Sequence, residues 1–457
     1  MGSLIENCTI DVINEIINYL EPDAIRNLRL SCKTLAIKSS SLYHVKALFQ
    51  SKHVDLTEQA LRACAEGTQA GGLCCLVEEL TLSSIAGGGD APRRTRQGRV
   101  QLWRKNKDSL LSQSFIALKR NGPTRRLASL SLEVAVPPDL KARLQPADAR
   151  AEYDWRPVSE AAVDTFHTTF RALATSQLRT ESLNMFNGPG QQRCSLPCNA
   201  LSKVDWDDEG LTESLSSMRS LSISLSNRVS KFDEDEDGHV ITDNRTTRRS
   251  RRNHHNEEDV SIAQDERNFT GLASLFQLLK NLKSFELHYF RLRGELQGLP
   301  LPMDWCHERL LQHLVTLNSL PNLTRSTLRG IYATETDLLA FIKQTRVSEL
   351  SLENVTLSSG TFRSIFDYCT STATSVTKLN FNVLYEMGAQ PSPMVLFLGP
   401  GRSRLGYDAF GLGSESLERS GDDINQPISY HTPPPPPMGS PVMARYVAFR
   451  RREYGST

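Results

Sequence analysis

The chain has 457 residues, with 53 Lys and Arg against 52 Asp and Glu and a net charge of +1. This length allows two or three domains, and the balanced charge disfavours a dedicated nucleic-acid or membrane-surface binder. No run approaches the roughly 18 apolar residues of a transmembrane helix, and the first residues do not have the pattern of a signal peptide. The nine cysteines are scattered; we expect reduced thiols and a cytoplasmic and/or nuclear protein.

The first 50 residues are predicted to form three short helices. The apolar residues of the first helix recur three and four positions apart, at Val12, Ile13, Ile16, Ile17 and Leu20. Pro22 ends this helix, Asp23 is expected to cap the second, and Ser31 the third. So small a unit cannot bury enough surface to be very stable alone, so it needs a partner or the rest of the chain.

The segment Cys8 to Leu35 resembles the F-box, whose pattern is roughly L-P-x-E-I-L-x-x-I-L-x-Y-L-x-P-x-D-L-x-x-L-R-L-V-C-K-x-L. The specific part of the match is the run from Leu28 to Leu35 that follows Pro22. The chain departs from the pattern at Cys8-Thr9, which stand where the family has Leu-Pro. A helical hairpin that caps a larger domain is the alternative interpretation.

The resemblance implies that residues 1–50 bind a Skp-type adaptor and, through it, a cullin. The adaptor-binding residues that it implies are Cys8, Thr9, Val12, Ile13, Ile16, Ile17, Leu20, Pro22, Leu28, Leu30, Cys32 and Leu35.

Residues 51–387 repeat the pattern apolar-x-x-Leu-x-apolar, whose alternation predicts strands. It occurs at 77–82, 127–132, near Leu183, and at 221–225, 282–287, 320–323, 347–352 and 376–381. Helical spacing precedes most of these runs, at 159–174, 272–279, 308–317, 337–344 and 361–369. The later spacing falls in the range of leucine-rich repeats, about 20–29 residues. We predict an α/β fold, an irregular leucine-rich-repeat-like solenoid of strand–helix units; the alternative is an α/β domain whose buried parallel strands share the pattern.

Polar insertions are expected to be loops or disordered, because they lack the apolar residues that offset the entropy of ordering. They are residues 87–98, 137–157, 187–210 and 227–267. Residues 388–457 are rich in Pro, Gly and Ser, and we predict a largely unfolded tail with a polyproline stretch at 433–437.

Few local motifs indicate chemistry. Residues 233–244 match part of an EF-hand loop, but position 12 is Asn244 instead of Glu, so an acidic insertion is favoured over a calcium site. The basic run 245–252 is either a nuclear import signal or a solvated loop. Cys194 and Cys198 lack the further ligands of a zinc site. We find no catalytic motif, and predict neither an enzyme nor a bound cofactor or metal.

The best interpretation is therefore an F-box protein. The resemblance implies a non-catalytic substrate adaptor that recruits an unknown target protein to a Skp–cullin–F-box ubiquitin ligase, with no nucleic acid or membrane involved. The alternative is an interaction scaffold with no link to a ligase.

Overall fold

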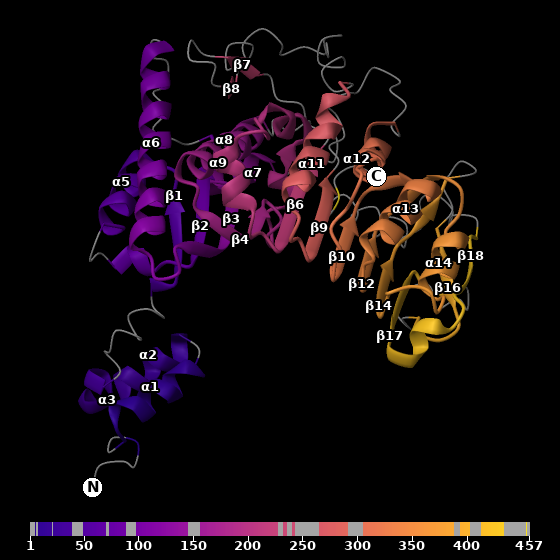
Figure 1. Cartoon of the computed structure of the whole chain (residues 1–457), viewed down its shortest axis with the longest axis horizontal. Helices are drawn as coiled ribbons and strands as arrows, with labels where there is room; N and C mark the ends of the chain where they lie inside the picture. Colours follow the sequence, from indigo (N-terminus) through magenta and orange to yellow (C-terminus); the bar gives the residue numbers. More distant parts are fainter. Residues whose placement is uncertain are drawn as a thin grey trace.

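The structure is a computed structural model. It describes residues 8–20, 22–38, 49–69, 73–87, 97–144, 156–226, 232–234, 240–242, 265–290, 305–387, 394–402 and 413–433, together with Ile5 and Tyr454. These residues have the predicted mixed α/β architecture, with one large and mostly parallel sheet. In Figure 1 the strands of this sheet lie side by side in the order of their colours, from indigo to orange.

The large sheet has eleven strands in the order β1-β2-β3-β4-β6-β9-β10-β12-β14-β17, and β5 pairs beside β6. All neighbours are parallel except β14 and β17. The bounds are β1 (Ser51–Asp55), β2 (Glu79–Ile85), β3 (Arg126–Ala135), β4 (Arg179–Met185), β5 (Leu196–Pro197), β6 (Ser220–Ser226), β9 (Ser284–Phe290), β10 (Arg325–Arg329), β12 (Glu349–Glu353), β14 (Lys378–Asn382) and β17 (Ser416–Ser420).

Two rows of buried side chains cross this sheet from β2 to β14, because the strand register aligns the Leu-x-Leu pairs. The first row is Leu80, Leu130, Leu183, Leu221, Phe285, Ser326, Leu350 and Leu379. The second row is Leu82, Leu132, Met185, Ile223, Leu287, Leu328, Leu352 and Phe381. These rows belong to one continuous core, so the predicted alternation of the strands is confirmed.

A layer of helices covers these two rows. It consists of α5 (Glu58–Gly67), α6 (Gln97–Asn121), α8 (Arg156–Ser176), α9 (Glu209–Leu215), α11 (Arg267–Leu278), α12 (Trp305–Val315), α13 (Glu335–Thr345) and α14 (Arg363–Cys369). The chain also forms short helical elements: α7 (Pro138–Leu144), η2 (Leu73–Leu76), η3 (Gln192–Cys194), η4 (Cys198–Lys203) and η7 (Gly421–Asn425). The helices α8 and α11 to α14 are those that the sequence predicted.

The sheet is open and does not form the predicted solenoid. A solenoid stacks equal units, but the connections here are unequal. The helix between β2 and β3 has 25 residues, and the helix between β12 and β14 has seven. The antiparallel strand β17 also ends the parallel series. One predicted strand, 320–323, is not a strand: β10 begins at Arg325, and Pro321 lacks the N–H that a ladder needs.

Only the last units repeat closely. After β10, β12 and β14 the chain turns at a left-handed residue, Gly330, Asn354 or Val383, with φ between 52° and 70°. Each turn leads into a strand of a second parallel sheet, β11 (Tyr332–Thr334), β13 (Thr356–Ser359) and β15 (Tyr385–Glu386).

Three of the predicted insertions contain regular secondary structure. Residues 187–210 contain η3, β5 and η4, and bury Cys194, Leu196 and Leu201 in the core. Gly271 of α11 permits this packing, since a Cβ there would lie 2.7 Å from the backbone carbon of Leu201. In the insertion 137–157, Pro138–Leu144 is the helix α7. Of the insertion 227–267, the structure describes β7 (Phe232–Glu234), β8 (Val240–Thr242) and the start of α11. The predicted disorder of residues 88–96 lies outside the described residues.

The prediction of an unfolded tail is wrong for residues 394–402 and 413–433. They form β16 (Leu396–Leu398), β17, η7 and β18 (Ser429–His431). β17 pairs with β14, and Phe397, Leu417 and Ile424 are buried in the main core. Nonlocal pairing with an edge strand orders a segment whose composition alone predicts disorder.

Candidate functional site

The N-terminal unit contains the three predicted helices, α1 (Ile10–Asn18), α2 (Pro22–Ser31) and α3 (Lys33–Lys38). Two predicted caps are wrong. Pro22 is the first residue of α2, so Asp23 lies within that helix, and Ser31 is the last residue of α2. The Ser31 hydroxyl donates to the Leu28 carbonyl at 2.6 Å, and the Cys32 sulfur accepts from the Leu35 N–H at the start of α3.

The unit has its own small core, separate from the core of the sheet. Ile13, Ile17 and Leu35 are buried in it. Four further residues pack against it and are partly buried: Cys8, Leu20, Leu28 and Cys32. The Lys38 ammonium donates to the Cys8 carbonyl at 2.8 Å, which ties the start of α1 to the end of α3.

Helix α1 carries a second apolar stripe that this core does not use. Val12, Ile16 and Tyr19 are four and three residues apart, which places them on one side of the helix. Val12 is 46% exposed, Tyr19 at the C-cap is 82% exposed, and Ile16 is partly exposed. Helix α1 therefore buries one apolar face in the core of its unit and presents a second apolar face to solvent.

Exposed apolar side chains gather in this unit. Within the part of the chain that the structure describes, seven large apolar side chains are exposed, and only Ile116 lies outside the unit. The other six are Ile5, Ile10, Val12, Tyr19, Leu30 and Ile37. Because single exposed apolar residues are ordinary, their concentration in one short unit is the informative observation.

The structure divides the predicted adaptor-binding residues. Ile13, Ile17 and Leu35 are buried in the core of the unit, and their role as contact residues stays a prediction. Cys8, Leu20, Leu28 and Cys32 have only part of their surface available, as has Ile16, whereas Thr9, Val12 and Leu30 are exposed. The side-chain environment of Pro22 lies outside the described residues. The sequence analysis did not select Ile10, Tyr19 or Ile37, although helical spacing alone could have placed Tyr19 in the stripe with Val12.

The face of the sheet that points away from the helices is polar. Its residues alternate with the buried rows, and small hydroxyl side chains dominate its centre, at Ser129, Ser131, Ser182, Ser220, Ser222 and Ser284. We call this surface the open face. Two of its arginines are paired with carboxylates of neighbouring strands: Arg325 with Glu349 at 2.9 Å and Arg329 with Glu286 at 2.6 Å.

A hydrogen-bond network joins four strands at the carboxyl edge of the open face. Asn187, just after β4, donates to the Ser222 hydroxyl of β6 at 2.8 Å, and Ser222 donates to the Glu286 carboxylate of β9 at 3.2 Å. Arg329 of β10 donates to the Asn187 side-chain oxygen at 3.0 Å. The Arg329 Nε is buried without a hydrogen-bond partner in the described structure. The network holds the guanidinium in place at the surface.

Ser224 and His288 lie one step further along the same two strands. The Ser224 hydroxyl is 2.9 Å from the His288 Nδ1 and 2.8 Å from the Ser195 hydroxyl. A serine beside a histidine is typical of a nucleophile and its base, but such a pair needs access to substrate. All three residues are buried, so a substrate has no access to the Ser224 hydroxyl. This cluster supports packing of the segment around β5 and does not support acyl transfer.

The helix layer contains a second polar cluster, between α6 and α8. Lys107 pairs with Asp164, and Asp108 pairs with Arg171 at 2.9 Å. Lys107 is buried, and burial raises the pKa of Asp108 although Arg171 opposes the shift. Burial, helped by the positive charge of Arg171, lowers the pKa of His167 to about 3. We call this set the ionic seam; it joins two helices through paired charges.

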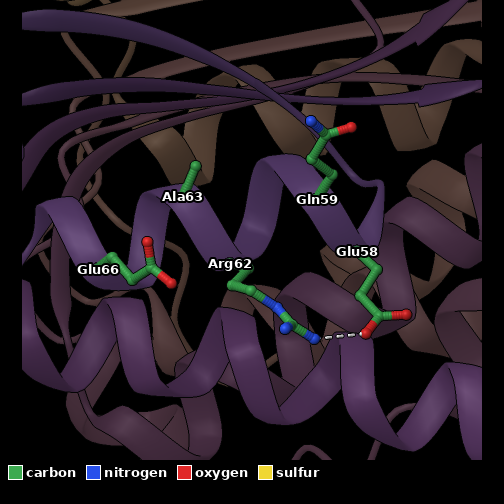
Figure 2. Close-up of a pocket in the computed structure, with 5 residues that line it drawn as sticks. All are labelled: Glu58, Gln59, Arg62, Ala63 and Glu66. Carbon is green, nitrogen blue, oxygen red and sulfur yellow. Dashed lines mark hydrogen bonds and ion pairs between the residues drawn. The ribbon is translucent and has the colours of Figure 1, made fainter.

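Figure 2 shows a surface pocket that is lined by Glu58, Gln59, Arg62, Ala63 and Glu66. All five belong to α5, and Arg62 pairs with Glu58 one turn earlier at 2.8 Å. Because the lining comes from a single helix, no other element of the described chain supplies groups that could converge on a ligand.

Metal and membrane sites are equally unsupported. In the residues described, no three metal-ligating side chains lie close enough to share an ion, and no helix is long and apolar enough to cross a bilayer. The candidate EF-hand loop begins within β7, which pairs with β8 as an antiparallel hairpin. The helix that should precede an EF-hand loop is therefore replaced by a strand.

No known family model matches the chain, and no curated protein matches it.

Proposed function

We propose that this protein is a non-catalytic substrate adaptor, which binds a Skp-type adaptor of a cullin ubiquitin ligase through α1 to α3 and holds a target protein on its sheet. The observation that supports this most is the second apolar stripe of α1. The likeness of residues 8–35 to the F-box supplies the identity of the partner. The chain would act by bringing a target close to the ligase, which raises effective concentration without any chemistry of its own.

The exposed side chains are suitable for such a contact. Large apolar and aromatic residues at the centre of an interface provide most of its binding energy. Fully burying one such side chain is worth roughly 1.5–3 kcal/mol. Val12, Tyr19 and Leu30 are exposed in the free unit, so they can gain this energy on binding without disturbing Ile13, Ile17 and Leu35.

Titration of a purified Skp-type adaptor against the full chain tests the proposal. We expect Val12→Ala with Tyr19→Ala to weaken binding by at least about 10-fold, since a factor of ten is about 1.4 kcal/mol. Ile116→Ala is the matched control, because Ile116 is also 46% exposed but lies in α6. It should leave the affinity unchanged. If the wild-type chain fails to bind the adaptor, the ligase link is lost and the interaction scaffold remains.

Restoring the family's Leu-Pro at positions 8 and 9 should change the adaptor affinity in the opposite direction. The backbone of Thr9 has φ −64° and ψ 160°, which proline adopts without strain, and Cys8 already packs partly against the core of the unit. Cys8→Leu with Thr9→Pro should therefore fold normally. On this proposal it tightens adaptor binding, and an unchanged affinity would show that these two positions do not contact the partner.

A further inference from the structure

The carboxyl edge of the open face already holds an aromatic side chain from far along the sequence. Tyr454 is 8% exposed, and its ring centroid lies 5.7 Å from that of His288. His288 in turn lies 6.2 Å from Phe290 at the end of the same strand. His288 thus has two aromatic neighbours, Phe290 of β9 and Tyr454.

Gly330 completes the seat of this tyrosine. It is the left-handed residue that follows β10, with φ +70°. A Cβ at this position would lie 3.0 Å from the Tyr454 Cδ1 and 2.4 Å from the Tyr289 carbonyl oxygen. The corresponding positions after β12 and β14 carry Asn354 and Val383. The turn after β10 is therefore the one of these three that leaves room for a ring against the backbone.

The neighbouring groups can orient a peptide around such a ring. Arg329 precedes Gly330 and is held by Glu286 and Asn187. Its Nε is the buried donor that has no acceptor in the described structure. A backbone carbonyl or a carboxylate next to an inserted aromatic residue would supply an acceptor there.

We propose that the seat formed by His288, Phe290 and Gly330 is a recognition site for an aromatic residue of a peptide, and that the chain's own Tyr454 fills it in cis. A tethered segment competes at an effective concentration on the order of millimolar, so it screens the site against weak ligands. A target with an aromatic residue has to displace Tyr454 before it binds. This inference goes beyond the proposed function and stands without any adaptor, because it concerns the sheet alone.

The test is to supply the segment in trans. The probe is a fluorescein-labelled peptide of residues 445–457, titrated by fluorescence anisotropy against full-length wild type and full-length Tyr454→Ala. We expect the variant to bind at least 10-fold more tightly than wild type, because its own segment no longer fills the seat. The same peptide with Tyr454→Ala should bind neither protein, whereas the peptide with Tyr446→Ala, the matched control, should bind the variant like the unchanged peptide.

Hydrogen exchange distinguishes a binding site from simple loss of packing. Amides at 288–290 and 330–332 should exchange faster in Tyr454→Ala than in wild type, and the unchanged peptide should restore their protection. Equal binding of the peptide to both proteins would overturn the proposal, as would binding that survives Tyr454→Ala in the peptide or protection that the peptide does not restore.

Discussion

The first and last parts of the sheet have the same strand pattern but differently built helix layers. Over β2 to β4 the helices are long, and α6 and α8 meet through the ionic seam. Over β12 and β14 the helix α14 is short and carries Phe366, whose ring packs 5.2 Å from Phe381 and 5.7 Å from Phe397. The same two rows of buried side chains therefore support two kinds of helix packing.

The difference indicates what fixes the position of the helices in each part. Short repeated units fix the position of α14 through the turns at Asn354 and Val383, so an apolar core is sufficient. A helix of 25 residues such as α6 could slide against its neighbour, and charged pairs at defined positions select one register. We therefore interpret the ionic seam as a device that sets the alignment of α6 on α8.

The largest expected effect comes from breaking this seam. Lys107→Met removes the ammonium that pairs with the Asp164 carboxylate between the helices, and breaking a fully buried pair costs roughly 3–5 kcal/mol. Because the Asp164 side chain retains 20% exposure, we expect the lower end, about 3 kcal/mol, as a reduced midpoint of urea unfolding. The control Lys141→Met, at an exposed position in α7, should shift the midpoint little.

The double variant tests whether the uncompensated charge causes the loss of stability. Lys107→Met with Asp164→Leu removes both charges, so most of the lost stability should return. A double variant as unstable as Lys107→Met alone would contradict the view that an uncompensated charge causes the loss.

A smaller effect on stability is expected from His167 of α8. It should make the stability of the first part of the molecule depend on pH. Its pKa in the folded state is lowered from 6.5 to about 3, first by burial and then by Arg171, while Asp164 opposes and Lys203 reinforces the shift. The folded state thus favours the neutral ring. The resulting stability is complete above pH 6.5 and is lost as the pH falls toward 3, with a slope that approaches about 1.4 kcal/mol per pH unit.

Comparison of wild type with His167→Gln isolates this contribution. Burial raises the pKa of Asp108, so its contribution has the opposite sign: it is present at low pH and is lost as the pH rises through the folded-state value. Both proteins share Asp108, so the difference between their unfolding free energies at pH 7 and pH 5 reports His167 alone. Equal dependence on pH in the two proteins would show that the ring is not buried in its neutral form.

The sequence predicted the parts of this fold that depend on local alternation. Leu350 and Leu352 are buried, while Glu349, Ser351 and Glu353 are partly exposed, as the pattern of that strand requires. Helix α6 was missed because its periodicity is broken by the buried Lys107, which a pattern of apolar residues counts as polar. Strand β1 was missed because Val54 is its only buried residue.

Nonlocal contacts account for most of the other differences between the predicted fold and the structure. Leu196 pairs with Leu225 across two segments, and β17 pairs with β14 beyond the predicted end of the sheet. The N-terminal unit was predicted as three helices, but the sequence could not say which of two apolar stripes on α1 forms its core. Nothing in the sequence around Tyr454 indicates that it reaches His288.

The smallest effect concerns a feature that both parts of the sheet share, the left-handed residue between a helix and the next strand. Arg125 after α6 and Arg346 after α13 have φ of 54° and 48°, and both side chains are exposed. Glycine adopts this conformation without the steric cost that other residues have, roughly 1–2 kcal/mol. This gain is partly offset, because glycine also gives the unfolded chain more conformational entropy. Arg125→Gly and Arg346→Gly should therefore each stabilise the fold by a net of about 0.5–1 kcal/mol.

The control Lys343→Gly, within α13, should instead destabilise by about 1 kcal/mol. Thermal unfolding of the three variants measures these shifts. A gain at Arg346 with none at Arg125 would mean that the two parts of the sheet do not share this junction after all.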